Sequence, residues 1–396
     1  MWWLLAALAF GVDLDSAREQ AVARAIAVEQ AQADVDRAEG TFWVARSGAL
    51  PTVELFASAS TGAGLTSFGF DRPVRTQAAL GATGRWTLVA PASWASGTAA
   101  RHSLKGQRAM LDWSRVTARR EATIAVAELW AAQEIAASLE ASVGDAERAM
   151  AAVQSRVDNG LRPPAEAARS QATTASLRAR SIQANGEVAA ACAGLYALLR
   201  LDVVQTCSVV SPAWDAPREE EGRHPALIAA DEALAAAQAA RTAAVYDRLP
   251  TVSVTGTAGD YFAGDRNGFG WSAGAEARVP LVSGGSGVGD NAVAVAVRER
   301  ARLALEDEER RLTAARVAAL ARYEAADASV TALQSSVTAA DAALRLVDAR
   351  YSEGLESLDV WLGARRERDD ARVALAQGQA ATLVALAELE SVNGVW

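Results

Sequence analysis

The feature that most constrains the fold is a regular apolar spacing near the C-terminal end of the chain. Apolar or small residues recur there at alternating intervals of three and four: Tyr323, Ala326, Val330, Leu333, Val337, Ala340, Leu344, Val347 and Tyr351. This spacing is typical of a helix that packs along a partner helix. The pattern stops at Gly354, where glycine can take the left-handed conformation that ends a helix, and it resumes from Leu358 to Leu389. The sequence therefore predicts a long helical hairpin with a glycine tip.

The same pattern occurs earlier in the chain. The matching residues are Leu129, Ala132, Ala136, Leu139, Val143, Ala146, Met150, Val153 and Val157. They lead into Asp158-Asn159-Gly160, and Pro163 and Pro164 follow, where proline suits the first turn of a returning helix. Gly160 and Gly354 lie 194 residues apart. Because so many positions agree in register, we interpret the chain as an internal duplication.

Two segments in each half alternate between apolar and polar residues. They span 52–61 and 76–88 in the first half, and 251–262 and 269–282 in the second. Only Phe56 departs from the alternation in the first segment. Their lengths are close to the roughly 9–11 residues with which a tilted strand crosses a bilayer. An apolar face toward outer-membrane lipid and a polar face toward a wet lumen is typical of outer-membrane barrels. An ordinary sheet with one face on a core is the alternative.

Four strands are too few to close such a barrel, since about eight is the smallest workable number. Open strand edges in lipid would leave backbone groups without hydrogen bonds. We therefore expect copies of the chain to share a barrel, with about twelve strands from three copies. The predicted fold is mainly α with a small β part. Duplicated long helical hairpins are joined to four amphipathic strands, which are expected to contribute to a shared trimeric 12-stranded outer-membrane β-barrel.

The domain prediction follows the duplication. Residues 14–202 form the first repeat with its tip at 158–164, residues 203–224 a linker, and residues 225–396 the second repeat with its tip at 352–357. Residues 1–13 are a candidate signal peptide, because a short apolar run contains Ala7-Leu8-Ala9, although basic residues are missing from its start. A frayed apolar terminus is the alternative.

The helices of the first repeat are expected at approximate positions. One helix is predicted from about Asp15 to Ser47, with Asp15 or Ser16 as its cap. A second is predicted from about Ala99 to Asn159, which is roughly 60 residues or about 90 Å long. Globular domains rarely contain a helix of this length.

Composition excludes several classes of function. A formal net charge of −9 argues against a nucleic-acid partner. Two histidines and two cysteines are too few for a metal cluster. No nucleophile elbow, P-loop or metal motif occurs, so neither an enzyme nor a cofactor is expected. Cys192 falls where Leu386 falls in the second half, which favours a buried apolar thiol. A disulfide between Cys192 and Cys207 is the alternative in an oxidising periplasm.

Three short motifs add a family resemblance. Residues 249–252 repeat the Leu-Pro-Thr-Val of residues 50–53, residues 279–285 read Val-Pro-Leu-Val-Ser-Gly-Gly, and residues 351–354 read Tyr-Ser-Glu-Gly. In this order within a duplication, the chain resembles the TolC-type outer-membrane efflux proteins over residues 14–394. The resemblance implies a homotrimeric duct that passively exports substrates across the outer membrane, in which the helical hairpins form a coiled-coil tunnel that extends into the periplasm. It also implies a periplasmic adaptor and an inner-membrane pump as partners, in a tripartite efflux or type I secretion system.

The resemblance assigns roles to the two tips. Gly160, Leu161, Gly354 and Leu355 match the periplasmic entrance, where adaptors dock.

The resemblance also places an entrance gate at Tyr351, Glu166, Glu356 and Asp359. Glu356 stands where the family has an arginine, and Asp359 is one position early for a pore aspartate. The sequence therefore suggests a closing mechanism of its own. Asp359 is a candidate for a cation-attracting ring, with a solvated acid at a helix start as the alternative. Tyr351 is alternatively the last residue of the packing seam.

A second hypothesis for the whole chain is a non-transport periplasmic or surface-attached helical scaffold. It shares the helical hairpins, but it predicts that the apolar strand face packs against a core.

Overall fold

The structure is a computed structural model that describes residues 10–62, 75–201, 207–210, 222–263, 266–281 and 284–394. The chain divides into two compact units, and each takes segments from both halves of the duplication. Unit 1 comprises Met1–Ala31, Leu111–Pro225 and Arg310–Trp396, and unit 2 comprises Gln32–Met110 and Ala226–Glu309. Most of the candidate signal peptide and much of the predicted linker lie outside the described residues.

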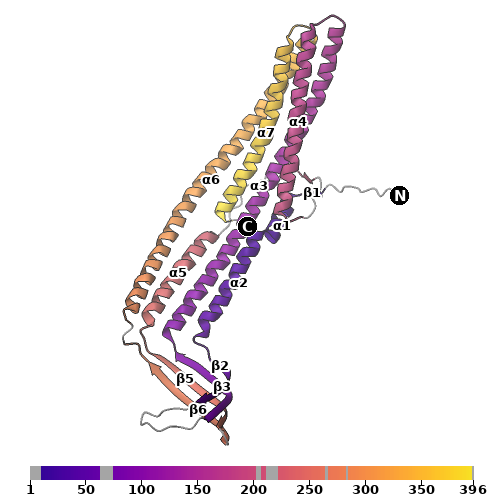
Figure 1. The fold of residues 1–396 in the computed structure, drawn as a ribbon. Coiled ribbons are helices and arrows are strands. Elements are labelled where there is room, and N and C mark those ends of the chain that lie inside the picture. Colours follow the sequence, from indigo (N-terminus) through magenta and orange to yellow (C-terminus); the bar gives the residue numbers. More distant parts are fainter. Residues whose placement is uncertain are drawn as a thin grey trace, which may run out of the picture. The chain divides into compact units, whose positions relative to one another are not determined.

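Two long helical hairpins are present, as the seam predicts (Figure 1). The helices are α1 (Leu14–Arg24), α2 (Ile26–Ser47), α3 (Pro91–Asp158), α4 (Pro164–Leu198), α5 (Pro225–Tyr246), α6 (Ser286–Ser352) and α7 (Leu358–Asn393). The α3–α4 and α6–α7 hairpins turn at Gly160 and Gly354, which have φ angles of 72° and 78°. Because only glycine adopts this region at little cost, these two residues set the hairpin turns.

The first predicted helix is wrong in two respects. It is interrupted at Ala25, whose ψ of 130° is extended and separates α1 from α2. Its cap is Asp13, not Asp15 or Ser16, and the Ser16 hydroxyl donates to the Asp13 carbonyl at 2.8 Å. The long helix α3 begins at Pro91, earlier than the predicted Ala99, because proline is well suited to a first helical position.

The core of unit 1 is built largely from small residues that let helices approach closely. Ala17, Ala122, Val126, Leu129 and Leu195 bring α1, α3 and α4 together. At the same level of α3, another set packs against α7, made up of Ala127, Trp130, Ala131, Ala380 and Leu383. Alanine at these positions favours both helix formation and close packing.

A disulfide joins Cys192 of α4 to Cys207, so the favoured prediction of a buried free thiol is wrong. Cys207 begins β4 (Cys207–Val209), which pairs in parallel with β1 (Phe10–Val12). The side chain of Gln133 brackets this strand, donating to the Cys207 carbonyl at 2.6 Å and accepting from the Val209 amide at 3.1 Å. The predicted linker therefore contains a strand that is fixed covalently to α4.

Unit 2 contains an antiparallel sheet of four strands in the order β2-β3-β5-β6 (Figure 1). The strands are β2 (Thr52–Gly62), β3 (Arg75–Val89), β5 (Thr251–Ala263) and β6 (Arg266–Arg278). The last prediction began three residues late and ended four residues late, since β6 spans Arg266–Arg278 and not 269–282. Pro280 explains the earlier end, because proline has no N–H to donate to a ladder.

A row of glycines crosses the sheet and explains the irregular Phe56. Phe56 pairs with Gly81, Gly81 with Gly259, and Gly259 with Gly270. A Cβ on Gly81 would lie 2.4 Å from the Ala258 carbonyl oxygen and 3.0 Å from the Phe56 ring. A Cβ on Gly259 would similarly lie 2.5 Å from the carbonyl oxygen of Leu80 in β3. The backbones of β3 and β5 approach too closely here for any residue other than glycine. The Phe56 ring lies over Gly81, where a side chain is missing.

The apolar side chains of the strands are exposed in the single chain. The most exposed are Val53, Leu55, Leu80, Phe269 and Trp271, at 59–86%. The face that the scaffold hypothesis places against a core is therefore uncovered within the described chain. None of the described helices combines the length and apolar character needed to cross a membrane.

Candidate functional site at the helical tips

The two tips of unit 1 end their helices in the same way. At the first tip, the Gly160 amide donates to the Val157 carbonyl at 2.9 Å, and the Leu161 amide donates to the Arg156 carbonyl at 2.8 Å. At the second tip, Gly354 and Leu355 make the equivalent bonds to Tyr351 and Arg350, at 3.1 and 2.9 Å. This pair of bonds is a Schellman motif, which satisfies the last carbonyls of a helix. The duplication thus extends to individual hydrogen bonds.

Each motif leaves a leucine in solvent. Leu161 is 71% exposed and Leu355 is 65% exposed. In a Schellman motif, the residue after the glycine often packs back on the helix. Here it does so only to a small extent. Both tips therefore present an apolar side chain on a rigid turn.

Below the second tip, an aromatic pair fills the space between the hairpins. Tyr351 of α6 and Trp361 of α7 stack with ring centroids 4.4 Å apart and 9° between their planes. Both residues are buried, and they join a cluster with Ala149 and Val153 of α3. The indole N–H donates to Asp348 at 2.8 Å, which fixes the orientation of the Trp361 ring.

Two arginines from the first hairpin lie over the ring of Tyr351. The guanidinium carbons of Arg156 and Arg162 lie 5.3 and 5.4 Å from the tyrosine ring centre, within cation–π range. Arg162 also pairs with Glu166 at 3.5 Å. The Tyr351 hydroxyl is shielded from solvent and has no hydrogen-bond partner in the described structure. Burial, and then the nearby Glu166 carboxylate, raise the pKa of Tyr351.

The other two predicted gate residues form ion pairs within the chain. Glu356 pairs with Arg350 at 3.4 Å, so the second tip carries its arginine on the helix and not after the glycine. Asp359 accepts two hydrogen bonds from Arg169 of α4, at 2.8 and 2.7 Å. Both side chains of that pair are more than 60% exposed, which limits the stability it contributes.

The structure thus brings Tyr351 and Glu166 to one cluster and leaves Glu356 and Asp359 in separate ion pairs. Sequence reasoning missed Trp361, Arg156, Arg162 and Arg169. One signal was available for Arg162, which lies two residues after Gly160, while Glu356 lies two residues after Gly354. The arginine that the resemblance places after the second tip stands after the first.

Comparison with known proteins agrees with this architecture. The family model described as outer membrane efflux protein matches residues 17–199 and 216–395. Because these residues make up most of the chain, it belongs to the outer membrane efflux protein family, and the TolC-type resemblance is confirmed. Members of this family are efflux channels of the outer membrane and not enzymes. A search of curated protein sequences found no match.

Several solved structures share the fold. A membrane protein from Pseudomonas aeruginosa is 20% identical with a TM-score of 0.88, covering 99% of this chain and 94% of that chain. The CmeC outer membrane channel of Campylobacter jejuni is 16% identical with a TM-score of 0.87, covering 96% and 85%. The MtrE outer membrane channel of Neisseria gonorrhoeae, in an open state, is 20% identical with a TM-score of 0.81, covering 100% and 93%. These likenesses establish the mainly helical channel fold with its small sheet.

Proposed function

We propose that the chain is one protomer of a homotrimeric outer-membrane duct that extends into the periplasm. It passively exports substrates that a periplasmic adaptor and an inner-membrane pump deliver, in a tripartite efflux or type I secretion system. The observation that carries the proposal is the four-stranded sheet with two open edges. Among the described residues, β2 pairs only with β3, and β6 pairs only with β5. The exposed apolar face of the sheet is suited to contact with lipid. Unpaired backbone groups at a strand edge are costly in lipid, so the edges must pair with other strands.

Three copies joined edge to edge satisfy both needs. The edge strands β2 and β6 have 11 and 13 residues, so each is long enough to pair across a bilayer with a neighbouring copy. Twelve strands also enclose a wider lumen than the minimum of about eight. The polar strand residues would then line a wet passage.

The test is the assembly and conductance of the full chain. Protein extracted from outer membranes in mild detergent should migrate as a heat-sensitive trimer and conduct ions in planar bilayers. A water-soluble monomer that does not partition into membranes would refute the proposal.

Within this proposal, Gly160, Leu161, Gly354 and Leu355 form the adaptor-docking surface. Exposed leucines on rigid turns suit an apolar contact with a helical partner. Leu161→Asp and Leu355→Asp should reduce adaptor binding and efflux while trimer assembly continues. Val317→Asp is the matched control, because Val317 is similarly exposed, at 68%, but lies much earlier on α6, far from the tip. Normal efflux in both tip variants would rule out docking there.

The gate assignment is also a proposal. Tyr351, Glu166, Glu356 and Asp359 would hold the entrance closed through contacts inside each protomer. The supporting geometry is the buried Tyr351–Trp361 stack and the pairs Arg350–Glu356 and Arg169–Asp359.

A further inference from the structure

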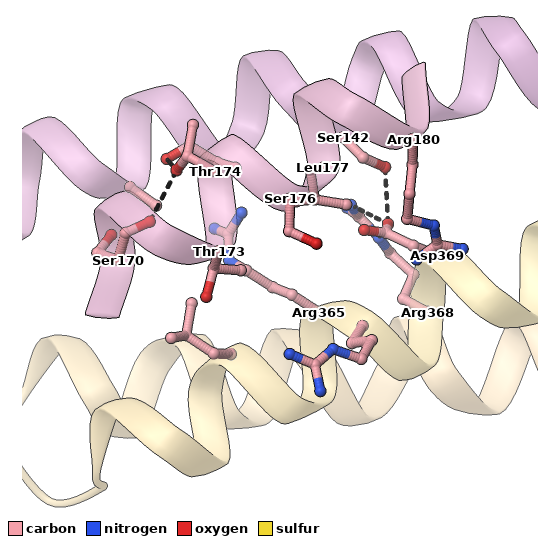
Figure 2. A pocket seen from close by; sticks show the side chains of 14 residues that line it. Ser142, Ser170, Thr173, Thr174, Ser176, Leu177, Arg180, Arg365, Arg368 and Asp369 are labelled. Atoms are coloured by element: carbon pink, nitrogen blue, oxygen red, sulfur yellow. Dashed lines mark hydrogen bonds and ion pairs between the residues drawn. The ribbon is translucent and has the colours of Figure 1, made fainter. Parts of the chain in front are cut away.

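A cleft in unit 1 is lined by more arginines than carboxylates. It has a volume of about 50 Å³ and lies between α3, α4 and α7 (Figure 2). The charged residues that line it are Arg180, Arg365, Arg366, Arg368 and Asp369. Four guanidinium groups therefore face one carboxylate among the lining residues.

Two ion pairs between α4 and α7 bracket this cleft. Arg169 pairs with Asp359 at 2.7 Å, and Arg180 pairs with Asp370 at 3.0 Å. From the first ion pair to the second, the position advances by eleven residues on both α4 and α7, which is about three helical turns. The two helices thus run parallel and in register, with an arginine on α4 facing an acid on α7 at each end.

Between the bracketing pairs, the pattern is broken. Here α7 supplies Arg365 and Arg366, but α4 supplies hydroxyl groups, notably Thr173 and Ser176, and has no acid between Arg169 and Arg180. Figure 2 shows Arg365 and Arg368 projecting from the side of α7 that faces α4, with Thr173 and Ser176 opposite. The centre of the cleft therefore combines cations with hydroxyl donors.

Arg368 is neutralised by two close carboxylates, whereas Arg365 has one longer ion pair and stacks on the Trp361 ring, with its guanidinium carbon 4.4 Å from the ring centre. Arg368 donates to Asp369 at 2.7 Å and to Asp145 at 3.1 Å, and the Ser142 hydroxyl completes this cluster with a 2.8 Å bond to Asp369. The nearest acid to Arg365 is Asp348 at 3.8 Å, whose same oxygen already accepts the Trp361 indole N–H. The Nε atom of Arg365 is shielded from solvent and has no hydrogen-bond partner in the described structure.

The Arg365 side chain is only 19% exposed and its ion pair is long, so the cost of burying this guanidinium is only partly compensated. Burial lowers the pKa of Arg365, and the nearby Arg368 charge lowers it further. The carboxylates of Asp348 and Asp145 act in the opposite direction but do not cancel this shift. Arg366 is exposed and makes no ion pair among the described residues. The planar guanidinium is suited to carboxylate, sulfate and phosphate groups, which accept two parallel hydrogen bonds.

We propose that this cleft binds a small free oxyanion between Arg365 of α7 and the Thr173 and Ser176 hydroxyls of α4. The anion supplies the counter-charge that α4 lacks between its two ion pairs, and it holds the two hairpins together. The site does not depend on the proposed transport function.

Calorimetric titration and thermal unfolding of the full chain in detergent test the site. Sodium sulfate, phosphate and acetate are titrated separately against sodium chloride at equal ionic strength. At least one oxyanion should bind saturably and raise the unfolding temperature. Sulfate or phosphate binding would identify a tetrahedral anion, and acetate binding alone would identify a carboxylate. Either result supports the site, whereas four salts with the same effect would overturn it.

Matched variants locate the binding. Arg365→Gln should weaken the apparent affinity about tenfold or more, since a hydrogen bond to a charged group is lost. Ser176→Ala should weaken it less and serves if Arg365→Gln does not fold. Arg178→Gln is the control, because Arg178 pairs with Glu147 outside the cleft and is 61% exposed. Equal weakening by Arg178→Gln and Arg365→Gln, or no effect of Ser176→Ala and Arg365→Gln, would contradict the site.

Discussion

Tyr351 and Trp361 lie face to face, 4.4 Å apart, and Tyr351 reaches the first hairpin through Arg156, which donates to its carbonyl at 3.5 Å. The phenol hydroxyl takes no part in these contacts. The closing role that we propose for this tyrosine would therefore depend on its ring and not on its hydroxyl.

We expect Tyr351→Phe to leave the tip intact, because only an unpartnered hydroxyl is lost. Trp361→Ala should destabilise the tip by about 3–5 kcal/mol, as is usual for removing a buried aromatic ring. Hydrogen exchange of residues 345–365 measures both changes. Trp94→Ala, at a tryptophan that is 52% exposed, is the control. A large effect of Tyr351→Phe would show that the hydroxyl is needed.

Alkaline pH should loosen the same tip. The pKa of Tyr351 is raised above its ordinary value of 10.0, so its neutral form is favoured in the folded state. The stability that this contributes is complete below pH 10 and is lost as the pH rises through the higher folded pKa. Absorbance titration should find one tyrosine that ionises above the rest, and Tyr351→Phe should remove it.

Charge on the apolar strand face should block insertion into membranes. Val254→Arg and Ala275→Arg place a cation on that face and should cost about 2–4 kcal/mol if they lie near the bilayer centre. Ser272→Arg, on the opposite face of β6, is the control and should assemble. Outer-membrane fractionation distinguishes them. Normal assembly of all three variants would refute a lipid-facing strand surface.

The glycine row should be intolerant of side chains. Gly259→Val puts its Cβ within 2.5 Å of a backbone oxygen of β3 and should prevent β3–β5 pairing. Gly268→Val, where no atom lies within 4 Å of the added carbon, should be tolerated far better. The yield of folded protein from outer membranes is the measurement. Equal yields would show that the two strands can separate without loss.

Removal of the disulfide should destabilise unit 1. Cys192 and Cys207 are 15 residues apart, and a loop of that size corresponds to about 3 kcal/mol in the chain-entropy account. The Cys192→Ser, Cys207→Ser double variant should therefore unfold at lower denaturant concentration, and adding a reductant should have no further effect on it. An unchanged midpoint would mean that the Gln133 contacts suffice to hold β4.

The fold was predictable where a pattern repeats over many residues. The 3,4 seam and the glycines at 160 and 354 predicted both hairpins, and alternation predicted all four strands of the sheet. Features set by a few contacts were not predictable. Ala25 carries no sequence signal for its extended backbone, and β1 and β4 have three residues each, too few to show a period.

The candidate site divides in the same way. Tyr351 and the tip glycines follow from the seam and the resemblance, whereas Arg156, Arg162 and Trp361 meet only because two hairpins lie side by side. The Arg169–Asp359 pair joins residues 190 positions apart, on helices whose relative register the sequence does not specify. Such contacts require the packed structure.

The exchange of Arg162 and Glu356 gives the two tips different identities. Both tips share one backbone geometry, but a basic residue follows the glycine at the first and an acidic residue follows it at the second. In the proposed trimer, six tips of one backbone geometry would present Arg162 and Glu356 in turn, with Arg162 paired to Glu166 and Glu356 paired to Arg350. A partner that makes one charged contact with a tip would favour every other tip, because a mismatched charge opposes binding. Three copies of such a partner, not six, would then bind around the trimer.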